Sequence, residues 1–569
     1  MNMNRVFRLA LLALSFNGTF ALEPAELGLF GISPCHINNR SAKDAERWVP
    51  QMEAIGLRYY RACATGWGLV EPAEGQWSWT ELDGQMDYLQ EHGFTFGGMF
   101  NGNTRWNTKD QPRTLPVNNL PAWSAHVTAL VQHTRGRIRH WEIWNEPPNG
   151  TGRDQTAADY AKIVVSAYDA AKAVDPDCLI GLAAKSVHIN YLEQAIQAGA
   201  KDHFDYITLH PYEVLNGIAS NAGTEAVFMN IVPTMRRMLK AQNPAKADVP
   251  IIFTELGCDV KRGADTQAHA LVKGYAMGAA QGVTCIQWFE GRDGDSGPLG
   301  LIDAKGQPRP AYTAMAQMIQ HLGQRPLYLG WLQFHDRHPA FLFQGAEKPV
   351  LITWAQKDSA DVIEFGPDAV IVDPLTGEKI PSTAPTLTVA PILVLGANEE
   401  MLNQARANLD KRMPWGGDFT KARSVSLTMK DGQPVPKGLH TLSGDSVAQA
   451  VLAYGGSARA GNVPGGNLFI VDPGFMSYHT EPVEITIVVR RNEANDKAGF
   501  KLVYESTSGF KTAGGWFNIP DNQEWHTVRR RIDDAQFVNY WGYNFALESD
   551  GNEFNNYLIQ SVTVTKVNP

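Results

Sequence analysis

Short apolar segments alternate with helical patterns through the first 320 residues, and this rhythm limits the fold more than any other feature of the chain. Each apolar segment has the length and composition of a buried strand, and they are residues 28–33, 57–64, 94–101, 138–146, 178–184, 204–212, 249–257 and 283–291. The clearest helical pattern follows Thr156, a predicted N-cap, and stops before Pro176. Eight strands, each followed by a helix, predict a (β/α)8 barrel over residues 22–322.

A doubly wound α/β sheet is the competing architecture. It rarely needs eight strand–helix units, and its nucleotide-binding form carries a glycine-rich turn directly after the first strand. No such turn follows residues 28–33. The barrel is therefore the expected fold.

At 569 residues the chain is too long for one compact domain. Short strand patterns with turn sequences predict a small β domain over residues 323–400, and residues 401–422 read as a linker. The alternating pattern of residues 423–569 predicts a C-terminal β-sandwich of jelly-roll type. Similar modules bind carbohydrate, so we consider an aromatic platform made by Trp516, Trp525, Tyr540 and Trp541, against the alternative that these rings fill the core.

The N-terminus has the pattern of a secretory signal peptide over residues 1–21. Arg5 and Arg8 precede an apolar run that is too short to span a bilayer, and small and polar residues follow. We therefore expect a secreted or periplasmic protein without a membrane span. The five cysteines match no metal-site spacing, and most are expected to be buried small side chains, with one or two disulfides left open.

The net charge of the chain limits the classes of molecule that it can bind. The formal net charge is −9 and the isoelectric point is near 5.9, which argues against a nucleic-acid partner. Hydrophobic content of 44% with 19% charged residues is typical of a folded globular protein.

Polar residues gather at the carboxyl ends of the predicted strands, where barrel enzymes place their active sites. The second strand carries Arg58 and Arg61, and other strands end in the polar or aromatic residues Asn145, Glu146, His210, Tyr212, Glu255, Trp288 and Glu290. Two carboxylates on non-adjacent strands, Glu146 and Glu255, suggest a pair that converges across the barrel mouth.

These motifs resemble those of the clan A glycoside hydrolases. "WNEP" closes the fourth strand and "FTELG" the seventh, and residues 67–93, 159–177 and 287–315 are similar to the clan's flanking segments. Within the clan the sequence is most similar to family 39, which includes β-xylosidases and bacterial exopolysaccharide hydrolases. The similarity covers about half of the chain. It implies that Glu146 is the acid/base, that Glu255 is the nucleophile, and that the substrate is a polysaccharide or oligosaccharide.

The chemistry of glycoside cleavage agrees with this pair. One carboxyl group must protonate the departing oxygen while the other meets the positively charged sugar carbon. We expect the apolar neighbours Trp144, Pro147 and Pro148 to raise the pKa of Glu146, so that it keeps its proton. Glu255 must be ionised, and Arg61 and Tyr212 are the expected donors to it.

The remaining candidates are predicted to bind the substrate. Asn145 is expected at the sugar 2-hydroxyl, and Trp288 as a stacking floor. Arg61 is favoured over Arg58, which is expected in a structural ion pair. His210 is either a substrate contact or a core histidine, and Glu290 and Trp106 either line the groove or belong to loops.

Three functional classes remain to compare. A secreted retaining β-glycoside hydrolase needs both carboxylates, and both are present. A non-catalytic carbohydrate-binding protein on a barrel scaffold would be indicated by the loss of one of them. A metal-dependent lyase or isomerase would need acidic ligands on successive strands, which the middle strands lack. The first class is predicted, without a cofactor or metal, while the sugar, the linkage and the oligomeric state stay open.

Overall fold

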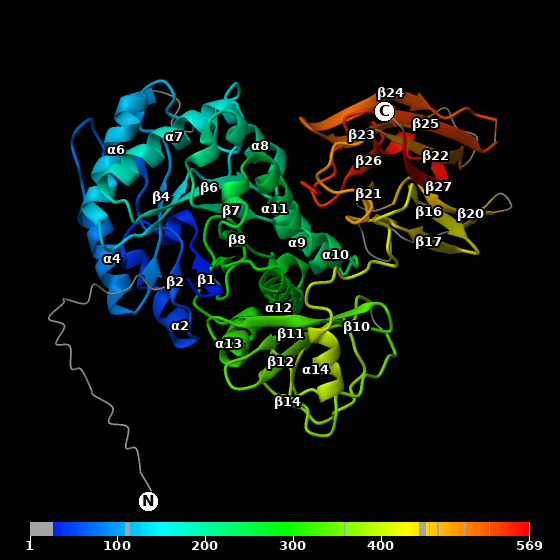
Figure 1. The fold of residues 1–569 in the computed structure, drawn as a ribbon, viewed down its shortest axis with the longest axis horizontal. Coiled ribbons are helices and arrows are strands. Elements are labelled where there is room, and N and C mark those ends of the chain that lie inside the picture. The colour runs from blue at the N-terminus through cyan, green and yellow to red at the C-terminus, as the bar shows by residue number, and fades with distance from the viewer. Residues whose placement is uncertain are drawn as a thin grey trace, which may run out of the picture.

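The computed structural model describes residues 27–108, 114–357, 359–442, 451–453, 456–463, 466–492, 497–522 and 524–567. The predicted signal peptide, residues 1–21, lies outside these ranges. Figure 1 shows the three parts of the chain: a barrel wrapped in helices, a small sheet, and a sandwich beside α8 and α11 (Figure 1). No helix in the described part of the chain combines the length and the apolar character needed to cross a membrane.

The barrel prediction is confirmed. All neighbouring strands of the first sheet run parallel, in the order β3-β2-β1-β9-β8-β7-β6-β5-β4. The strands are β1 (Phe30–Ser33), β2 (Tyr59–Tyr60), β3 (Thr95–Phe96), β4 (Gly98–Phe100), β5 (His140–Ile143), β6 (Leu179–Lys185), β7 (Tyr206–His210), β8 (Ile251–Leu256) and β9 (Cys285–Phe289). Each of the eight predicted segments overlaps at least one of them.

Gly97 explains why the third predicted strand appears as two pieces. Its backbone N–H bonds Tyr60 O on one side, and its carbonyl accepts from Cys63 N, so pairing with the second strand continues through it. A Cβ here would lie 2.6 Å from Arg61 O, which leaves room for glycine alone. β3 and β4 therefore act as one strand, and the barrel has eight.

Helices cover the barrel from outside. They are α1 (Ala42–Ala45), α2 (Val49–Ala54), α3 (Trp67–Val70), α4 (Thr80–Glu91), α5 (Arg105–Thr108), α6 (Leu120–Thr134), α7 (Ala157–Val174), α8 (Ile189–Gln197), α9 (Tyr212–Ala219), α10 (Glu225–Phe228), α11 (Ile231–Gln242), α12 (Ala264–Ala280) and α13 (Pro310–Leu322). α7 begins as predicted, because Thr156 and Asp159 form a capping box in which the Asp159 carboxylate accepts from Thr156 N at 3.0 Å. Its buried face packs into the same core as the strands.

The second part is a six-stranded antiparallel sheet with its own small core. It contains β10 (Leu327–Phe334), β11 (His338–Gln344), β12 (Pro349–Thr353), β13 (Val370–Val372), β14 (Lys379–Ile380) and β15 (Ile392–Leu395). The stretch expected to be a linker starts differently: α14 (Glu399–Arg406) buries Leu402 and Ala405 against this sheet. An apolar pair on one helical face offsets the polar composition that suggested a linker.

The third part is the predicted β-sandwich, with an antiparallel sheet of seven strands and one of five. Its strands are β16 (Ser424–Lys430), β17 (Gln433–Lys437), β18 (Leu439–Thr441), β19 (Val451–Ala453), β20 (Gly456–Ala460), β21 (Asn467–Val471), β22 (Val483–Arg491), β23 (Gly499–Ser506), β24 (Gly509–Asn518), β25 (His526–Ile532), β26 (Phe545–Glu548) and β27 (Tyr557–Lys566). In β22 buried and half-buried residues alternate strictly, as expected of a strand with one face on the core.

Candidate active site

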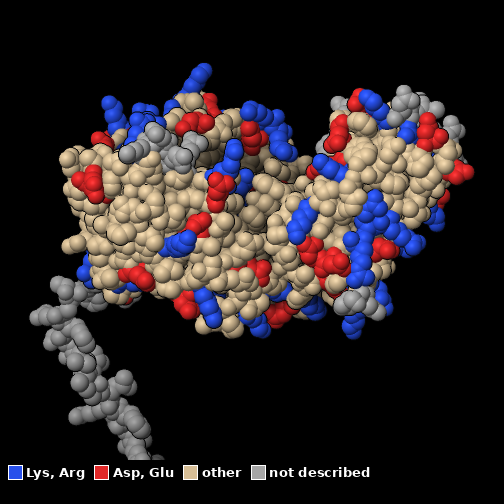
Figure 2. Space-filling model, turned by 90° about the horizontal axis from the view of Figure 1, so that it is seen from above, with Lys and Arg blue, Asp and Glu red and all other residues tan. Residues whose placement is uncertain are grey.

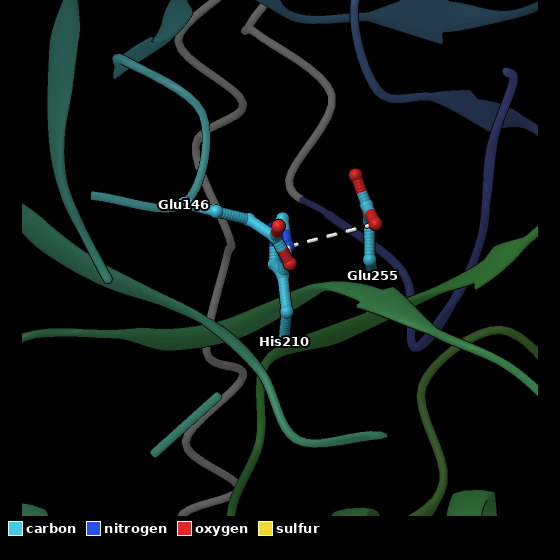
Figure 3. A group of neighbouring side chains, drawn as sticks. All are labelled: Glu146, His210 and Glu255. Atoms are coloured by element: carbon cyan, nitrogen blue, oxygen red, sulfur yellow. Dashed lines mark hydrogen bonds and ion pairs between the residues drawn. The ribbon is translucent and has the colours of Figure 1, made fainter. Parts of the chain in front are cut away.

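Glu146, His210 and Glu255 meet at the carboxyl ends of the barrel strands (Figure 3). Glu146 follows β5, His210 ends β7, and Glu255 lies near the end of β8. One carboxylate oxygen of Glu146 lies within 4.8 Å of one of Glu255. The strand ends thus bring together the two carboxylates that the sequence predicts as a pair.

The backbone around Glu146 explains its position. Trp144 and Glu146 both have a left-handed backbone, with φ of 68° and 52°. Trp144 is buried in the core. A tight turn after β5 therefore sends the Glu146 side chain toward the barrel mouth instead of along a helix.

Glu255 is held by two donors, as predicted. Tyr212 donates its hydroxyl to Glu255 Oε2 at 2.9 Å, and Arg61 Nη1 donates to Glu255 Oε1. Burial alone would lower the pKa of Arg61, but the charges of Glu142 and Glu255 more than offset this and raise it. The guanidinium is therefore a fixed positive charge beside the Glu255 carboxylate.

Arg61 also binds Glu142, a residue that the sequence reasoning missed. Its Nε donates to Glu142 Oε2 at 3.0 Å, while Thr208 and Thr254 donate to Glu142 Oε1 at 2.6 and 2.9 Å. Burial raises the pKa of Glu142, yet Arg61 and the other donors lower it overall. A charged residue inside an apolar strand was the signal in the sequence, since such a charge needs buried partners.

A substitution tests this support. Glu142→Gln should lower the free energy of unfolding by about 3 kcal/mol at pH 7, because it leaves the buried Arg61 with one carboxylate fewer. The folded-state pKa of Glu142 is depressed, so its contribution is complete above about pH 4.3 and disappears as pH falls through the folded pKa. The loss should therefore shrink below about pH 4.

Denaturant titration at pH 7 and at pH 3.5 measures both effects, with Glu91→Gln on the exposed end of α4 as the matched control. Equal unfolding free energies for wild type and Glu142→Gln at pH 7 would contradict the role of Glu142.

The tautomer of His210 follows from its neighbours. Arg61 Nη2 lies 3.2 Å from His210 Nε2, and because a guanidinium can only donate, we assign Nε2 as the acceptor. The ring proton then sits on Nδ1, which is 2.9 Å from Glu146 Oε1 and 3.5 Å from Glu255 Oε2. A single N–H thus lies between the two carboxylates.

This hydrogen bond corrects the expectation for Glu146. Burial does raise the pKa of Glu146, but the His210 contact outweighs it and the pKa lies below its usual range. The apolar neighbours are adjacent to Glu146 in the sequence, whereas His210 is 64 residues away and its contact is not visible there. In the free protein, Glu146 is therefore ionised.

The structure bears on four other sequence predictions. His210 is only 1% exposed and uses both ring nitrogens internally, which favours the core-histidine alternative over a substrate contact. Trp288 is fully buried in the core, with its indole N–H on Leu299 O, and so is not a stacking floor. Glu290 is also fully buried, and burial raises its pKa to about 7. Arg58 bonds the backbone carbonyls of Glu53 and Leu57 instead of an acidic partner.

The half-buried ring beside the site belongs to Phe289, one residue after Trp288. It packs edge-on against Tyr212, with ring centroids 6.5 Å apart. Asn145 accepts from Arg61 Nη2 at 2.9 Å and remains at the site. Trp106 packs edge-on against Trp67 and donates its indole N–H to Glu71 O, and its substrate role stays a prediction.

The same three side chains are the group of described residues that could hold a metal ion. Glu255, however, is already paired with the guanidinium of Arg61 and accepts the Tyr212 hydroxyl. The N–H of His210 points into the space between the two carboxylates. A cation there would meet a guanidinium and an N–H donor, so these residues fit a sugar better than a metal.

All five cysteines are buried and free, which agrees with the expectation of small buried side chains.

Comparison with known proteins relates the barrel to the glycoside hydrolases. Residues 62–318 match the model of glycosyl hydrolase family 10, a range that contains both glutamates. The barrel is a clan A glycoside hydrolase domain. Over 130 residues the chain is 27% identical to endo-1,4-beta-xylanase A of Phanerodontia chrysosporium, covering 20% of this chain and 29% of that protein. The chain thus spans less than a third of that relative's length.

A solved family 39 glycoside hydrolase from Bacteroides cellulosilyticus WH2 is similar with a TM-score of 0.54, at 18% identity, over 64% of this chain and 80% of that one. Likeness at this identity establishes the fold. Family 39 membership in particular stays a prediction.

Proposed function

We propose that this protein is a secreted retaining β-glycoside hydrolase that cleaves a polysaccharide or oligosaccharide. The supporting observation is the approach of Glu146 to Glu255, with oxygens within 4.8 Å. Retaining enzymes hold their carboxyl groups about 5–5.5 Å apart, whereas inverting enzymes leave about 6.5–9.5 Å for a water. A non-catalytic barrel has no reason to keep this pair. Export rests on the pattern of residues 1–21.

In the proposed first step Glu255 attacks the anomeric carbon while Glu146 gives its proton to the departing oxygen. The sugar–Glu255 bond forms as the glycosidic bond breaks. In the second step Glu146 takes a proton from water, whose oxygen displaces Glu255 from the sugar. Arg61 and Tyr212 stabilise the Glu255 carboxylate as it leaves.

His210 links the two steps. Its one N–H reaches Glu146 or Glu255, and the bond to Glu146 favours the ionised form of that group. When the N–H turns to Glu255, Glu146 loses the contact that keeps it ionised and can carry the proton for the first step. When it returns to Glu146, the group is ready to act as base.

Product stereochemistry tests the proposal. A panel of aryl β-glycosides and polysaccharides, xylan included, identifies a substrate, and NMR during the first minutes identifies the anomer that forms. We expect the β-anomer first, followed by slow mutarotation. An α-anomer formed first would overturn the retaining mechanism even if both glutamates were essential.

A further inference from the structure

A corner of the C-terminal sandwich (residues 538–543) lies on the barrel beside the acid/base. Ser186 Oγ donates to Tyr540 O at 2.9 Å, and the Tyr540 ring stacks on His188 with centroids 3.8 Å apart. Gly542 packs against the backbone of Glu213, where a Cβ would meet Glu213 O at 3.0 Å. The sandwich corner therefore bridges the loop after β6 and the first turn of α9.

The sandwich corner is rigidly built. Glu505 is buried, and its carboxylate accepts from the backbone N–H groups of Val538, Asn539 and Tyr540 at 2.8, 3.0 and 2.6 Å. Asn544 adds a fourth donor at 2.9 Å. These bonds fix the shape of the sandwich corner from inside the sandwich, so its aromatic side chains are preorganised.

These contacts correct the expected aromatic platform. The rings of Tyr540 and Trp541 are in contact, with centroids 4.4 Å apart, and both face the barrel. Trp516 lies on β24 and packs edge-on against Phe554. Trp516 and the pair thus belong to different places on the sandwich.

Lys185 connects the sandwich corner to the acid/base. It ends β6, and its backbone N–H donates to the carbonyl of Pro147, the residue after Glu146. Its ammonium lies 4.7 Å from the centre of the Trp541 ring. Among the described residues no carboxylate lies within ion-pair distance of that ammonium, so its charge is held in place but not neutralised.

Electrostatic effects confirm the proximity. The charge of Lys185 contributes to the lowered pKa of Glu146. Burial raises the pKa of Tyr540, and the negative charges of Glu213 and Glu146 add to this. Glu213 approaches the sandwich corner from the β7 side, at Gly542, while Lys185 approaches it from the β6 side at Trp541. The positive charge of Lys185 therefore lies on the side of the sandwich corner that faces Glu146.

The overall surface does not explain this lysine. Acidic and basic side chains are interspersed over the face shown in Figure 2, and the chain is acidic in total (Figure 2). Lys185 makes no ion pair with a described carboxylate, and its charge lies next to the proton donor, where a negative group of the substrate could pair with it.

We infer that Lys185, with Trp541 and Tyr540 of the sandwich corner, forms a subsite for a sugar that carries a carboxylate. This rests on the proposed function, because the acid/base faces the leaving group and a subsite beside it takes the leaving sugar. The ammonium pairs with the sugar carboxylate, and the aromatic rings pack against the C–H face of the sugar. The substrate class is an acidic polysaccharide, such as one that contains uronic acid.

Glycosyl transfer tests the subsite. The acceptor occupies the leaving-group position, and its hydroxyl oxygen attacks the sugar carbon, gives its proton to Glu146 and releases Glu255. With the best p-nitrophenyl β-glycoside as donor, methyl β-glucuronide should form transfer product about fivefold faster than methyl β-glucoside, the factor that a partly exposed ion pair provides. Nitrophenol release without acceptor reports on the proposed function alone.

Variants separate binding from folding. Lys185→Met should bring the ratio of the two acceptors to about one, and Trp541→Ala should lower it in the same direction. Lys162→Met on the exposed face of α7 and Trp516→Ala on β24 are the matched controls, and should keep the wild-type ratio.

Ligand-observed NMR with the two methyl glycosides repeats the comparison without turnover. A wild-type ratio of one in both assays, or a ratio that Lys185→Met leaves unchanged, overturns the subsite.

Discussion

Glu255→Ala should abolish turnover, by on the order of 10⁴-fold or more, because no neighbour can replace a carboxylate that forms a bond to the sugar. Glu255 accepts hydrogen bonds from Arg61 and Tyr212, and neither is a nucleophile in this setting. Added azide should enter the vacated space and restore part of the activity with an activated aryl β-glycoside. The product should be the α-glycosyl azide, of inverted configuration, which NMR identifies.

Two controls accompany this variant. Thermal unfolding must show that Glu255→Ala is folded, and Glu91→Ala on the exposed end of α4 should retain full activity. A folded Glu255→Ala protein with wild-type turnover would remove Glu255 from the mechanism.

Glu146→Gln should produce the second largest loss, about 10²–10⁴-fold, on glycosides whose leaving groups need a proton. Dinitrophenyl glycosides need little protonation, so their first step should be almost unaffected. The second step still lacks its base, and the glycosyl-enzyme should accumulate and give a burst of released phenol. Stopped-flow absorbance measures the burst and the steady rate.

Azide distinguishes the two glutamates. With Glu146→Ala it should attack the glycosyl-enzyme from the acid/base side and give the β-glycosyl azide, the opposite anomer to that from Glu255→Ala. Equal losses on protonation-dependent and activated substrates would show that Glu146 is not the general acid.

The barrel was predictable because each strand is a continuous apolar run with polar residues at its carboxyl end. The same property hid the orientation of the last strand. In a buried parallel strand both faces are apolar, so the sequence does not reveal that Trp288 points into the core and Phe289 lies beside Tyr212. Both rings are plausible neighbours of a sugar until the packing is known.

The glutamate pair was predictable from motifs, but its electrostatics were not. His210 is 64 residues from Glu146, and their hydrogen bond depends on the closure of the barrel. Glu142 likewise takes its donors from β7, β8 and the end of the second strand. The direction of the Glu146 pKa follows from such long-range contacts and not from its neighbours in the chain.

The sandwich shows the same limit. An exposed aromatic and an aromatic that docks on another domain look alike in a sequence, and Trp516 and Trp541 differ only in what the fold places next to them.

The largest apolar core does not stop at the barrel. Tyr478 and Val538 of the sandwich belong to it, as do Met413 and Trp415 from the segment that leads there. Polar bonds cross the same boundary, since Tyr478 donates to Glu193, and Asn230 and Arg237 both donate to Ser477. The sequence pattern divides this protein into modules, but its apolar core and hydrogen bonds extend across the boundary between them. A barrel truncated at residue 422 would expose the apolar surface that the sandwich covers and would leave the hydrogen-bonding groups at this boundary without their partners. The sandwich is therefore part of the folding unit and not a detachable accessory.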